Sequence, residues 1–270
     1  PSFSFDLGAA NAALKELYDD QKIANLVYKN NPFLAMVPKM EEFGGKYMPI
    51  PLIINTSQGR SATFSNAQSQ QTAATVESFA LTRIQNYSIA QIDNQTMLAS
   101  KTDKMAFING ATVVIDGAIR ALTNSLATQL FRAGSGTIGI VGAGSTRGVI
   151  KLSNPSDVVN FEVNMTLQAY TGSVLCTGVA GGTSTSTVYV VAVNRTAGTV
   201  SVSNLMGGTI GDGLGVWTAT VGSTLNVVGD KSLAMKGLGA WLPVVAPTTG
   251  DSFFSVDRSI DPTRLAGVRF

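Results

Sequence analysis

Residues 45–132 place the strongest constraint on how this chain can fold. An apolar segment, Lys46–Asn55, leads into a stretch of small and polar residues, Thr56–Thr75. A second long segment, Val76–Ile92, precedes a helical pattern from about Asp103 to Arg132. The pattern predicts a long hairpin arm mounted on one long helix. Because a projecting arm cannot bury both faces on its own domain, we expect its burial on neighbouring subunits, which favours assembly over catalysis.

The two arm segments differ in how they can pair. Pro49 and Pro51 cannot donate ladder hydrogen bonds, so the first segment must be an edge strand with these positions facing away from its partner. The second segment alternates apolar and polar residues as far as Ile92. The stretch between them is too polar to pack a core and predicts a tip that is mobile in the free subunit.

The helical pattern begins and ends at recognisable signals. Ser100–Asp103 resembles a capping box, and Gly134–Gly136 ends the pattern. About 30 residues at a rise of 1.5 Å would give a helix of roughly 45 Å. Upstream, residues 9–28 read as another helix, which Pro32 ends, and Phe33–Val37 is a short apolar segment.

The composition shifts from Thr137 onward toward short β segments. We expect strands at 137–141 and 149–152 and a helical turn at 155–159. Residues 161–229 are rich in Thr, Val, Gly and Ser and predict a small inserted β-barrel or sandwich. Its expected strands are 165–169, 172–177, 187–194, 199–202 and 215–218, separated by turn signals.

Composition excludes several classes of function. Charged residues make up 13% of the 270 residues, about half the usual share, and the net charge of +2 gives no basic face for nucleic acid. The chain has no histidine, which removes the commonest general base and metal ligand. Cys176 is the only cysteine, so no intrachain disulfide can form. No apolar run is long enough to predict a transmembrane helix.

Few residues suggest chemistry. The run from Thr137 through Gly142 and Gly144 resembles the start of a dinucleotide-binding turn. The next residues predict a strand instead of a helix, so we interpret it as a glycine-rich turn. Asp251, Asp257 and Asp261 favour turn capping and salt bridges over a cation site. Cys176 is expected to be a buried small hydrophobic residue, and Trp217 and Trp241 are expected to be core or junction anchors. We therefore expect no catalytic residue, no metal and no cofactor, and predict that the protein is not an enzyme.

Several short motifs resemble one known family. They are Asn31-Pro-Phe-Leu-Ala-Met-Val-Pro38, Phe43-Gly-Gly45 and Gln58-Gly-Arg-Ser-Ala-Thr-Phe64 with its Gln-rich continuation. Gly237-Leu-Gly-Ala-Trp-Leu-Pro243 and the run Asp257–Gly267 follow in the same order. Together they resemble major capsid proteins of tailed bacteriophages with the HK97 fold, over nearly the whole chain.

The resemblance implies an α+β fold of five parts. They are an N-terminal arm (1–43), an extended E-loop hairpin with flanking strands (44–100), a peripheral domain with its spine helix at 103–132 (101–160), the inserted β domain (161–229), and a return to the peripheral domain with the start of the axial domain (230–270). The remainder of the axial domain is expected to follow Phe270.

The implied function is a virion capsid protein that self-assembles into hexamers and pentamers of an icosahedral head enclosing double-stranded DNA. Expected partners are copies of the chain, a portal, and separate scaffolding and decoration proteins, with no membrane. The tip has no lysine, so we expect a shell without crosslinks, whose arm contacts use Arg60, Phe64, Gln68, Gln70 and Gln71. One alternative is the shell protein of an encapsulin-like bacterial compartment. Another is a β-rich tail or adhesin protein, although the long helix argues against it.

Overall fold

The computed structural model describes residues 31–38, 43–91, 104–180, 183–211 and 220–268. The expected helix at 9–28, the capping box at Ser100–Asp103 and the expected strand at 215–218 with Trp217 lie outside these ranges. The chain divides into two compact units, one of Pro1–Val37 with Asn86–Gly237 and one of Pro38–Gln85 with Leu238–Phe270. Both helix and strand are present, and most elements are strands.

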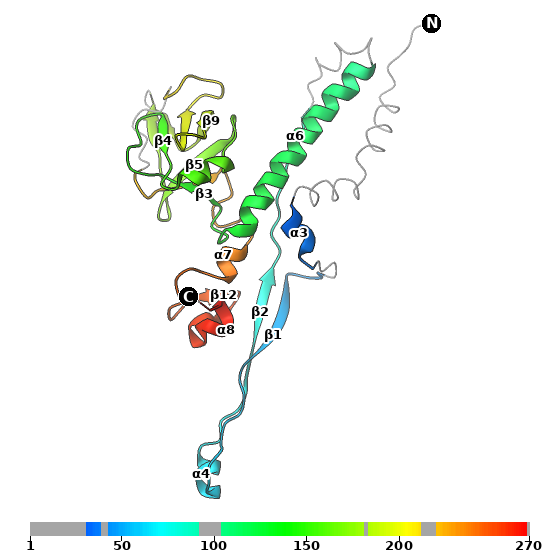
Figure 1. Ribbon diagram of the computed structural model, residues 1–270, viewed down its shortest axis with the longest axis vertical. Helices are drawn as coiled ribbons and strands as arrows, with labels where there is room; N and C mark the ends of the chain where they lie inside the picture. Colours follow the sequence, from blue (N-terminus) through cyan, green and yellow to red (C-terminus); the bar gives the residue numbers. More distant parts are fainter. Residues whose placement is uncertain (1–30, 39–42, 92–103, 181–182, 212–219, 269–270) are drawn as a thin grey trace. The chain divides into compact units, whose positions relative to one another are not determined.

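The first unit contains the long helix α6 (Lys104–Phe131), as the apolar periodicity predicts (Figure 1). The helix ends before Gly134, whose φ of +83° is a conformation that favours glycine. A short helix, α3 (Pro32–Met36), begins with proline in its first turn, where the missing N–H costs nothing. Asn31 Nδ2 donates to the Thr123 carbonyl of α6 at 3.3 Å, and the rings of Phe33 and Phe131 lie 5.5 Å apart.

The first unit also contains an antiparallel β-barrel. Its strands are β3 (Thr137–Ile140), β4 (Val149–Lys151), β5 (Thr166–Thr171), β6 (Val174–Leu175), β9 (Val188–Asn194), β10 (Thr199–Ser203) and β11 (Thr224–Val227). Their order is β3-β11-β5-β9-β10-β4, with β6 beside β5. The two ends of the sheet meet, because Gly142 N donates to Lys151 O at 2.7 Å and Ser153 N donates to Ile140 O at 2.8 Å. The first and last strands in this order are thus hydrogen-bonded to each other, which closes the sheet.

The barrel takes in more of the chain than the expected insertion at 161–229. It begins at Thr137, because β3 and β4 supply the strands that close it. Strands β11, β7 (Gly178–Ala180) and β8 (Thr183–Thr185) were not predicted. The other expected β segments and the turn η1 (Pro155–Asn160) are confirmed to within two residues at each end.

Alternating side chains fill the barrel, as the two-residue period of a strand requires. The fully buried ones include Leu167, Ala169, Val188, Val190, Val200, Val202 and Leu225. Phe161, which follows η1, has no exposed surface. A Cβ on Gly139 would lie 2.9 Å from its ring, so glycine at this position makes room for Phe161. Cys176 is buried, as expected.

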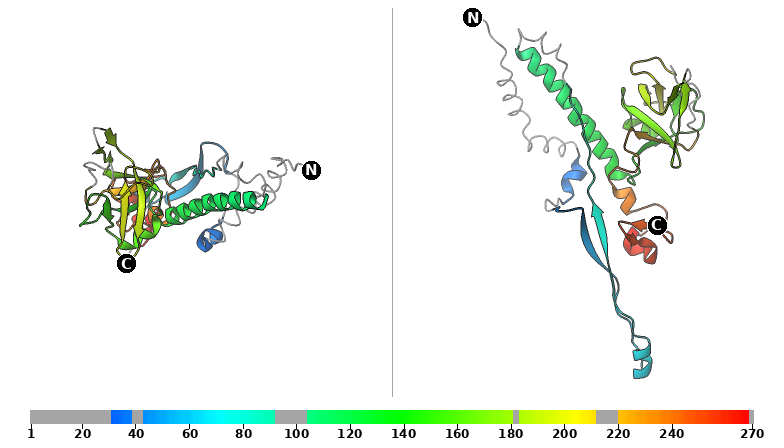
Figure 2. Two further views of the ribbon diagram at one scale, coloured as in Figure 1. Left: turned by 90° about the horizontal axis from the view of Figure 1, so that it is seen from above. Right: turned by 180° about the vertical axis from the view of Figure 1, so that it is seen from behind.

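The second unit pairs the arm with the C-terminal segment (Figures 1 and 2). The arm consists of β1 (Tyr47–Asn55), the tip helix α4 (Phe64–Ser69) and β2 (Thr75–Thr82). The C-terminal segment contains α7 (Leu238–Trp241), β12 (Ser252–Phe253), β13 (Val256–Asp257), η2 (Arg258–Ile260) and α8 (Pro262–Ala266). The second unit therefore joins residues from two of the expected parts, the E-loop hairpin (44–100) and the C-terminal part (230–270).

The second arm strand is shorter than its apolar alternation predicts. It ends at Thr82, because the partner of Thr82 is Tyr47, where β1 begins. Just before β1, Gly45 has a φ of +86° and breaks the strand, so nothing in β1 pairs with residues 83–91. Ile84, Tyr87 and Ile89 continue the alternation without forming a strand and are 42%, 76% and 87% exposed.

Candidate functional site: the projecting arm

One face of the arm packs against the C-terminal segment of the same unit. Phe79 is buried at the centre of this face, with Ile50, its partner in the ladder, beside it. The ring centroid of Phe79 lies 5.6 Å from that of Trp241 and 6.1 Å from that of Phe253, both edge-on. Such edge-to-face pairs add to the effect of apolar burial. Trp241 is thus an anchor between arm and C-terminal segment, as the sequence predicted.

Backbone groups of the arm also bond to the C-terminal segment. Ala80 N donates to Phe254 O at 2.9 Å, so this amide points away from β1. Its ladder partner is Pro49. Pro49 and Ala80 therefore form a pair without ladder hydrogen bonds, so Pro49 lies where β1 donates no backbone N–H to β2. This confirms the predicted orientation of the first arm strand. On the outer side of β1, Arg264 Nη1 donates to Ile54 O at 3.1 Å.

The turn that supplies the Phe254 carbonyl is unusual. Phe254 and Ser255 connect β12 to β13 with φ values of +48° and +73°. Two left-handed residues in succession suit a two-residue hairpin, but they are ordinarily Asn or Gly. Beside the turn, the Arg258 guanidinium lies 4.0 Å from the centroid of the Phe253 ring and donates to Ala240 O at 2.7 Å. The Arg258 contacts stabilise the C-terminal segment around the turn, whereas the Ala80–Phe254 bond and the packing of Phe79 on Phe253 join it to the arm.

The opposite face of the arm is apolar and exposed. Tyr47, Ile53 and Val76 are 55%, 60% and 63% exposed, and Pro49 and Pro51 of the same face are exposed as well. Ile53 and Val76 are ladder partners, so their side chains lie next to each other. The sequence interpretation did not single out these residues as contacts. The signal was present, because both the odd and the even positions of β1 are apolar, as in strands covered on two faces.

The tip of the arm is ordered by its own hydrogen bonds. Asn55 Oδ1 accepts from Thr75 N at 2.7 Å. Thr72 N donates to Gln58 O at 3.0 Å, and Gln58 N donates to Thr72 Oγ1 at 3.1 Å. Helix α4 then forms, with Ala67 N donating to Thr63 O at 3.0 Å. The sequence did not predict this helix. Small polar side chains there close local turns instead of requiring a core.

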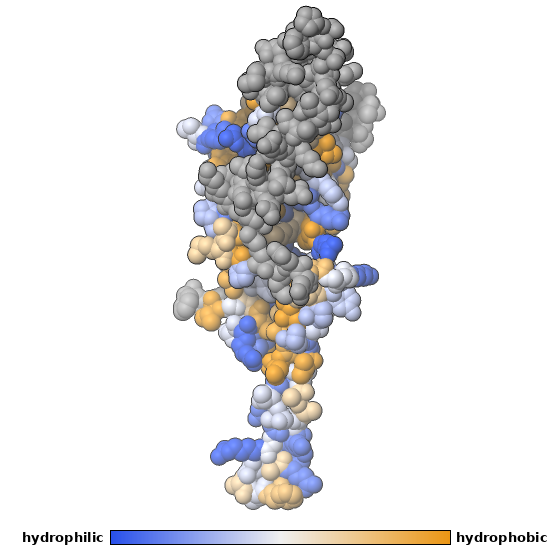
Figure 3. Space-filling model, turned by 90° about the vertical axis from the view of Figure 1, so that its right-hand side faces the viewer, coloured by the Kyte–Doolittle hydropathy of each residue, from blue (hydrophilic) through white to orange (hydrophobic). Residues whose placement is uncertain are grey.

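Four of the five predicted contact residues lie around one hollow at the tip. Arg60, Phe64, Gln68 and Gln71 line it together with Ser57, Gln58, Gly59 and Ala67, whereas Gln70 does not. Phe64 is 83% exposed, and Arg60 carries the only charge between Thr56 and Thr75. In Figure 3 the tip, at the lower end, presents hydrophilic and hydrophobic side chains next to each other. The hollow combines an aromatic ring, amides and one cation on an open surface.

Carboxylates near the base of the arm act as caps. Asp257 Oδ1 accepts from Ser259 N at 2.9 Å, and this bond holds the pKa of that carboxyl below its usual value. Asp261 caps α8, and bonds from Thr263 and from Arg264 N lower its pKa in the same way. Asp251 pairs with Arg258 at 2.9 Å. The expected capping and salt bridges are therefore confirmed for all three acids.

The other sequence candidates for chemistry take structural roles. The run Gly142–Gly148 is a turn between β3 and β4, as interpreted, and a Cβ on Gly142 would meet the Ser153 backbone at 2.8 Å. Among the described residues, no group of three His, Cys, Asp or Glu side chains could hold a metal ion. None of the helices within the described ranges combines the length and apolar character needed to cross a membrane.

Comparisons with known proteins give no relative. No protein-family model, no curated protein and no solved structure matches this chain.

Proposed function

We propose that this protein is the major capsid protein of a tailed bacteriophage, with an HK97-like fold. In this proposal it self-assembles into hexamers and pentamers of an icosahedral head that encloses double-stranded DNA. The observation that carries the proposal is the arm, which is packed on one face and apolar and exposed on the other. The order of the sequence motifs that resemble phage capsid proteins supports a phage head over other kinds of shell.

The exposed face of the arm gives association a driving force. Ile53 and Val76 are 60% and 63% exposed. Covering each of them would contribute about 1–2 kcal/mol, since full burial of such a side chain contributes about 1.5–3 kcal/mol. The prolines of β1 remove amide donors from its outer edge and so disfavour strand addition there. A neighbouring copy would therefore contact the flat face of the arm rather than its edge.

The tip would provide the second contact. Its hollow offers Phe64 as an apolar anchor and Arg60 as a donor to carboxylates or carbonyls. The tip contains no lysine, so these contacts would be non-covalent. Portal, scaffolding and decoration proteins would be separate chains, and the packaged DNA would be held without sequence recognition.

Electron microscopy of purified protein tests the proposal. The unaltered chain is expected to form closed shells. Replacing residues 58–71 with a short Gly-Ser turn should leave a folded subunit that forms no stable shell. Intact shells from the shortened chain would contradict the role of the tip.

Point variants refine the same test. Phe64→Ala and Arg60→Gln change the hollow, whereas Gln70→Ala alters a tip residue that does not line it. We expect the first two to reduce the yield of shells at a given protein concentration and the third to leave it unchanged. Equal effects of all three variants would speak against the hollow as a contact surface.

A further inference from the structure

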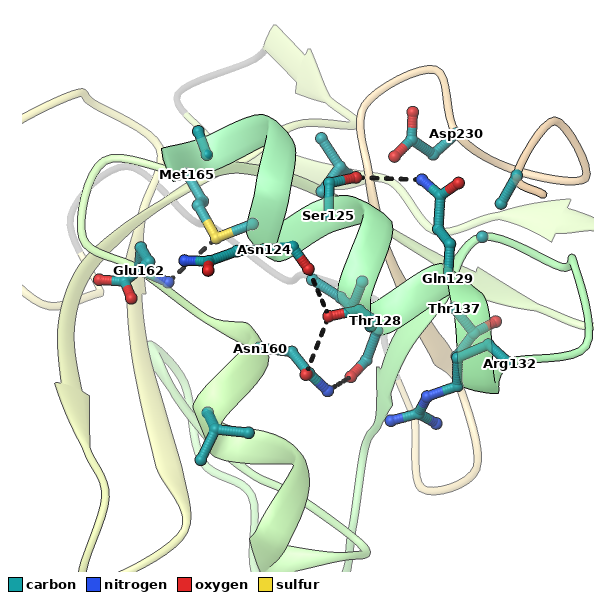
Figure 4. A pocket seen from close by; sticks show the side chains of 16 residues that line it. Asn124, Ser125, Thr128, Gln129, Arg132, Thr137, Asn160, Glu162, Met165 and Asp230 are labelled. Carbon is teal, nitrogen blue, oxygen red and sulfur yellow. Dashed lines mark hydrogen bonds between the residues drawn. The ribbon is translucent and has the colours of Figure 1, made fainter. Parts of the chain in front are cut away.

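A pocket in the first unit has no part in the proposed assembly. It lies between the C-terminal half of α6, the start of the barrel and the segment after β11, and has a volume of about 130 Å³ (Figure 4). Its walls are mainly apolar, with Ala121, Ile138, Met165, Val227 and Ala234 among them. A space of this size admits a ligand of only a few non-hydrogen atoms.

Most polar groups around the pocket are already paired. Gln129 Nε2 donates to Ser125 Oγ at 3.0 Å, and Gln129 Oε1 accepts from Met235 N at 3.1 Å. Asn160 Nδ2 donates to Ile138 O at 2.9 Å, and its Oδ1 lies 3.2 Å from Thr128 Oγ1. These bonds fix the side chains of α6 and η1, so the walls are rigid without a ligand.

The charged residues of the lining leave one negative charge without a partner. Arg132 Nη2 pairs with Asp157 at 2.6 Å, and Glu162 pairs with Arg195 at 3.5 Å. The half-buried carboxylate of Asp230 has neither a hydrogen bond nor an ion pair within the described ranges of the chain. Burial raises the pKa of this carboxyl, since its charged form loses water without gaining a donor. A half-buried carboxylate without a partner favours a cationic ligand.

We propose that the pocket binds a small aliphatic amine, with the ammonium group at Asp230 and the alkyl chain along the apolar wall. Glu162 lies on the opposite side of the pocket from Asp230 (Figure 4), but its carboxylate pairs with Arg195, so among the lining residues Asp230 alone offers a carboxylate to an ammonium group. An anion is disfavoured, because the one cation of the lining, Arg132, is held by Asp157. This binding does not depend on the proposed capsid function.

Calorimetric titration with n-butylamine and with 1,4-diaminobutane tests the proposal on the full chain. For ligands of about five or six non-hydrogen atoms we expect a dissociation constant of about 1 mM. 1-Butanol, which has the same length but no charge, should bind at least about tenfold more weakly, since charge-assisted hydrogen bonds are the stronger ones. Equal binding of butanol and butylamine, or no binding of either amine, would overturn the proposal.

Three variants assign the site. Asp230→Asn removes the charge, and Ala121→Leu fills the pocket from an exposed position of α6 without altering its charge. Both should weaken amine binding at least about tenfold, the first by loss of the charge-assisted bond. Asp116→Asn, the same chemical change on α6 outside the lining, should leave binding unaltered. Amine binding that persists in Asp230→Asn would overturn the assignment, and circular dichroism of each variant checks that the fold is retained.

Discussion

Removal of the Phe79 ring should release the arm from the C-terminal segment while leaving the barrel intact. Phe79 is 7% exposed and makes edge-to-face contacts with Trp241 and Phe253. Phe253 in turn packs edge-on against Trp241 at 4.9 Å. Phe79 therefore closes a triangle of rings that joins two segments more than 150 residues apart in the sequence. Phe79→Ala removes the only one of these rings that the arm contributes.

The expected cost of Phe79→Ala is about 3 kcal/mol. Truncation of a buried phenylalanine costs about 3–5 kcal/mol, and each edge-to-face pair accounts for about 0.5–1.5 kcal/mol of that. We place the value near the lower end, because the cluster is small and partly buried residues around it can move into the space. A loss of this size is a large share of the stability of a single unit.

Hydrogen exchange measured by mass spectrometry resolves the effect by segment. In Phe79→Ala, peptides from β1, β2 and β12–β13 should exchange faster, whereas peptides from the barrel should be unchanged. Val76→Ala is the matched control, since Val76 lies on the exposed face of the same strand and its truncation should cost less than about 0.5 kcal/mol. Faster exchange of the barrel, or equal behaviour of the two variants, would refute the reasoning.

Three further predictions concern contacts within one or the other unit. Gly139→Ala should destabilise the barrel by about 1–3 kcal/mol through overpacking. Gly117→Ala, on an open surface of α6, should instead stabilise the helix by about 0.5–1 kcal/mol, and thermal unfolding measures both effects. Arg258→Met should lower the free energy of unfolding in urea by about 2–3 kcal/mol, because it leaves the Ala240 carbonyl and the Asp251 carboxylate without their donor. An unchanged free energy of unfolding would show that the guanidinium does not stabilise the fold. Asp257 and Asp261 have lowered pKa values, so the stability they contribute is present above the unfolded-state pKa and is lost as the pH falls below about 4. Replacing both by Asn should therefore flatten the loss of stability of the second unit at acidic pH. An unchanged acid profile would contradict their role.

The sequence predicts those parts of the fold that a local pattern specifies. The long helix shows in its apolar periodicity, and the strands of the barrel show in alternating Val and Thr between turn signals. The orientation of Pro49 follows from its missing amide alone. The tip helix was missed, because helix α4 has only six residues, of which only Phe64 and Ala67 are apolar.

Contacts between distant segments could not be predicted in the same way. Strands β12 and β13 have two residues each, too few to show a period, and the turn between them has no glycine or asparagine to mark it. The pairing of Ala80 with Phe254 therefore leaves no trace in either segment. The pocket at Asp230 is likewise assembled from separate segments, and its carboxylate is notable only because the fold gives it no donor.

For the contact residues of the arm, the sequence drew attention to the tip and overlooked the stem. Unusual composition marked Arg60, Phe64 and the glutamines, and four of these five residues share one hollow. The sequence indicated that one face of the arm would be left for neighbouring subunits, but it did not identify Ile53 and Val76 as residues of that face, because both faces of the first strand are apolar. Only the structure shows which of the two apolar faces is covered within the chain.

Cryo-electron microscopy of particles assembled from the purified chain tests the central claim most directly. The proposal predicts closed shells in which residues 56–75 of each subunit lie on a neighbouring subunit, with Ile53 and Val76 covered by it. Protein that stays monomeric under all assembly conditions, or shells in which the arm contacts only its own subunit, would contradict it.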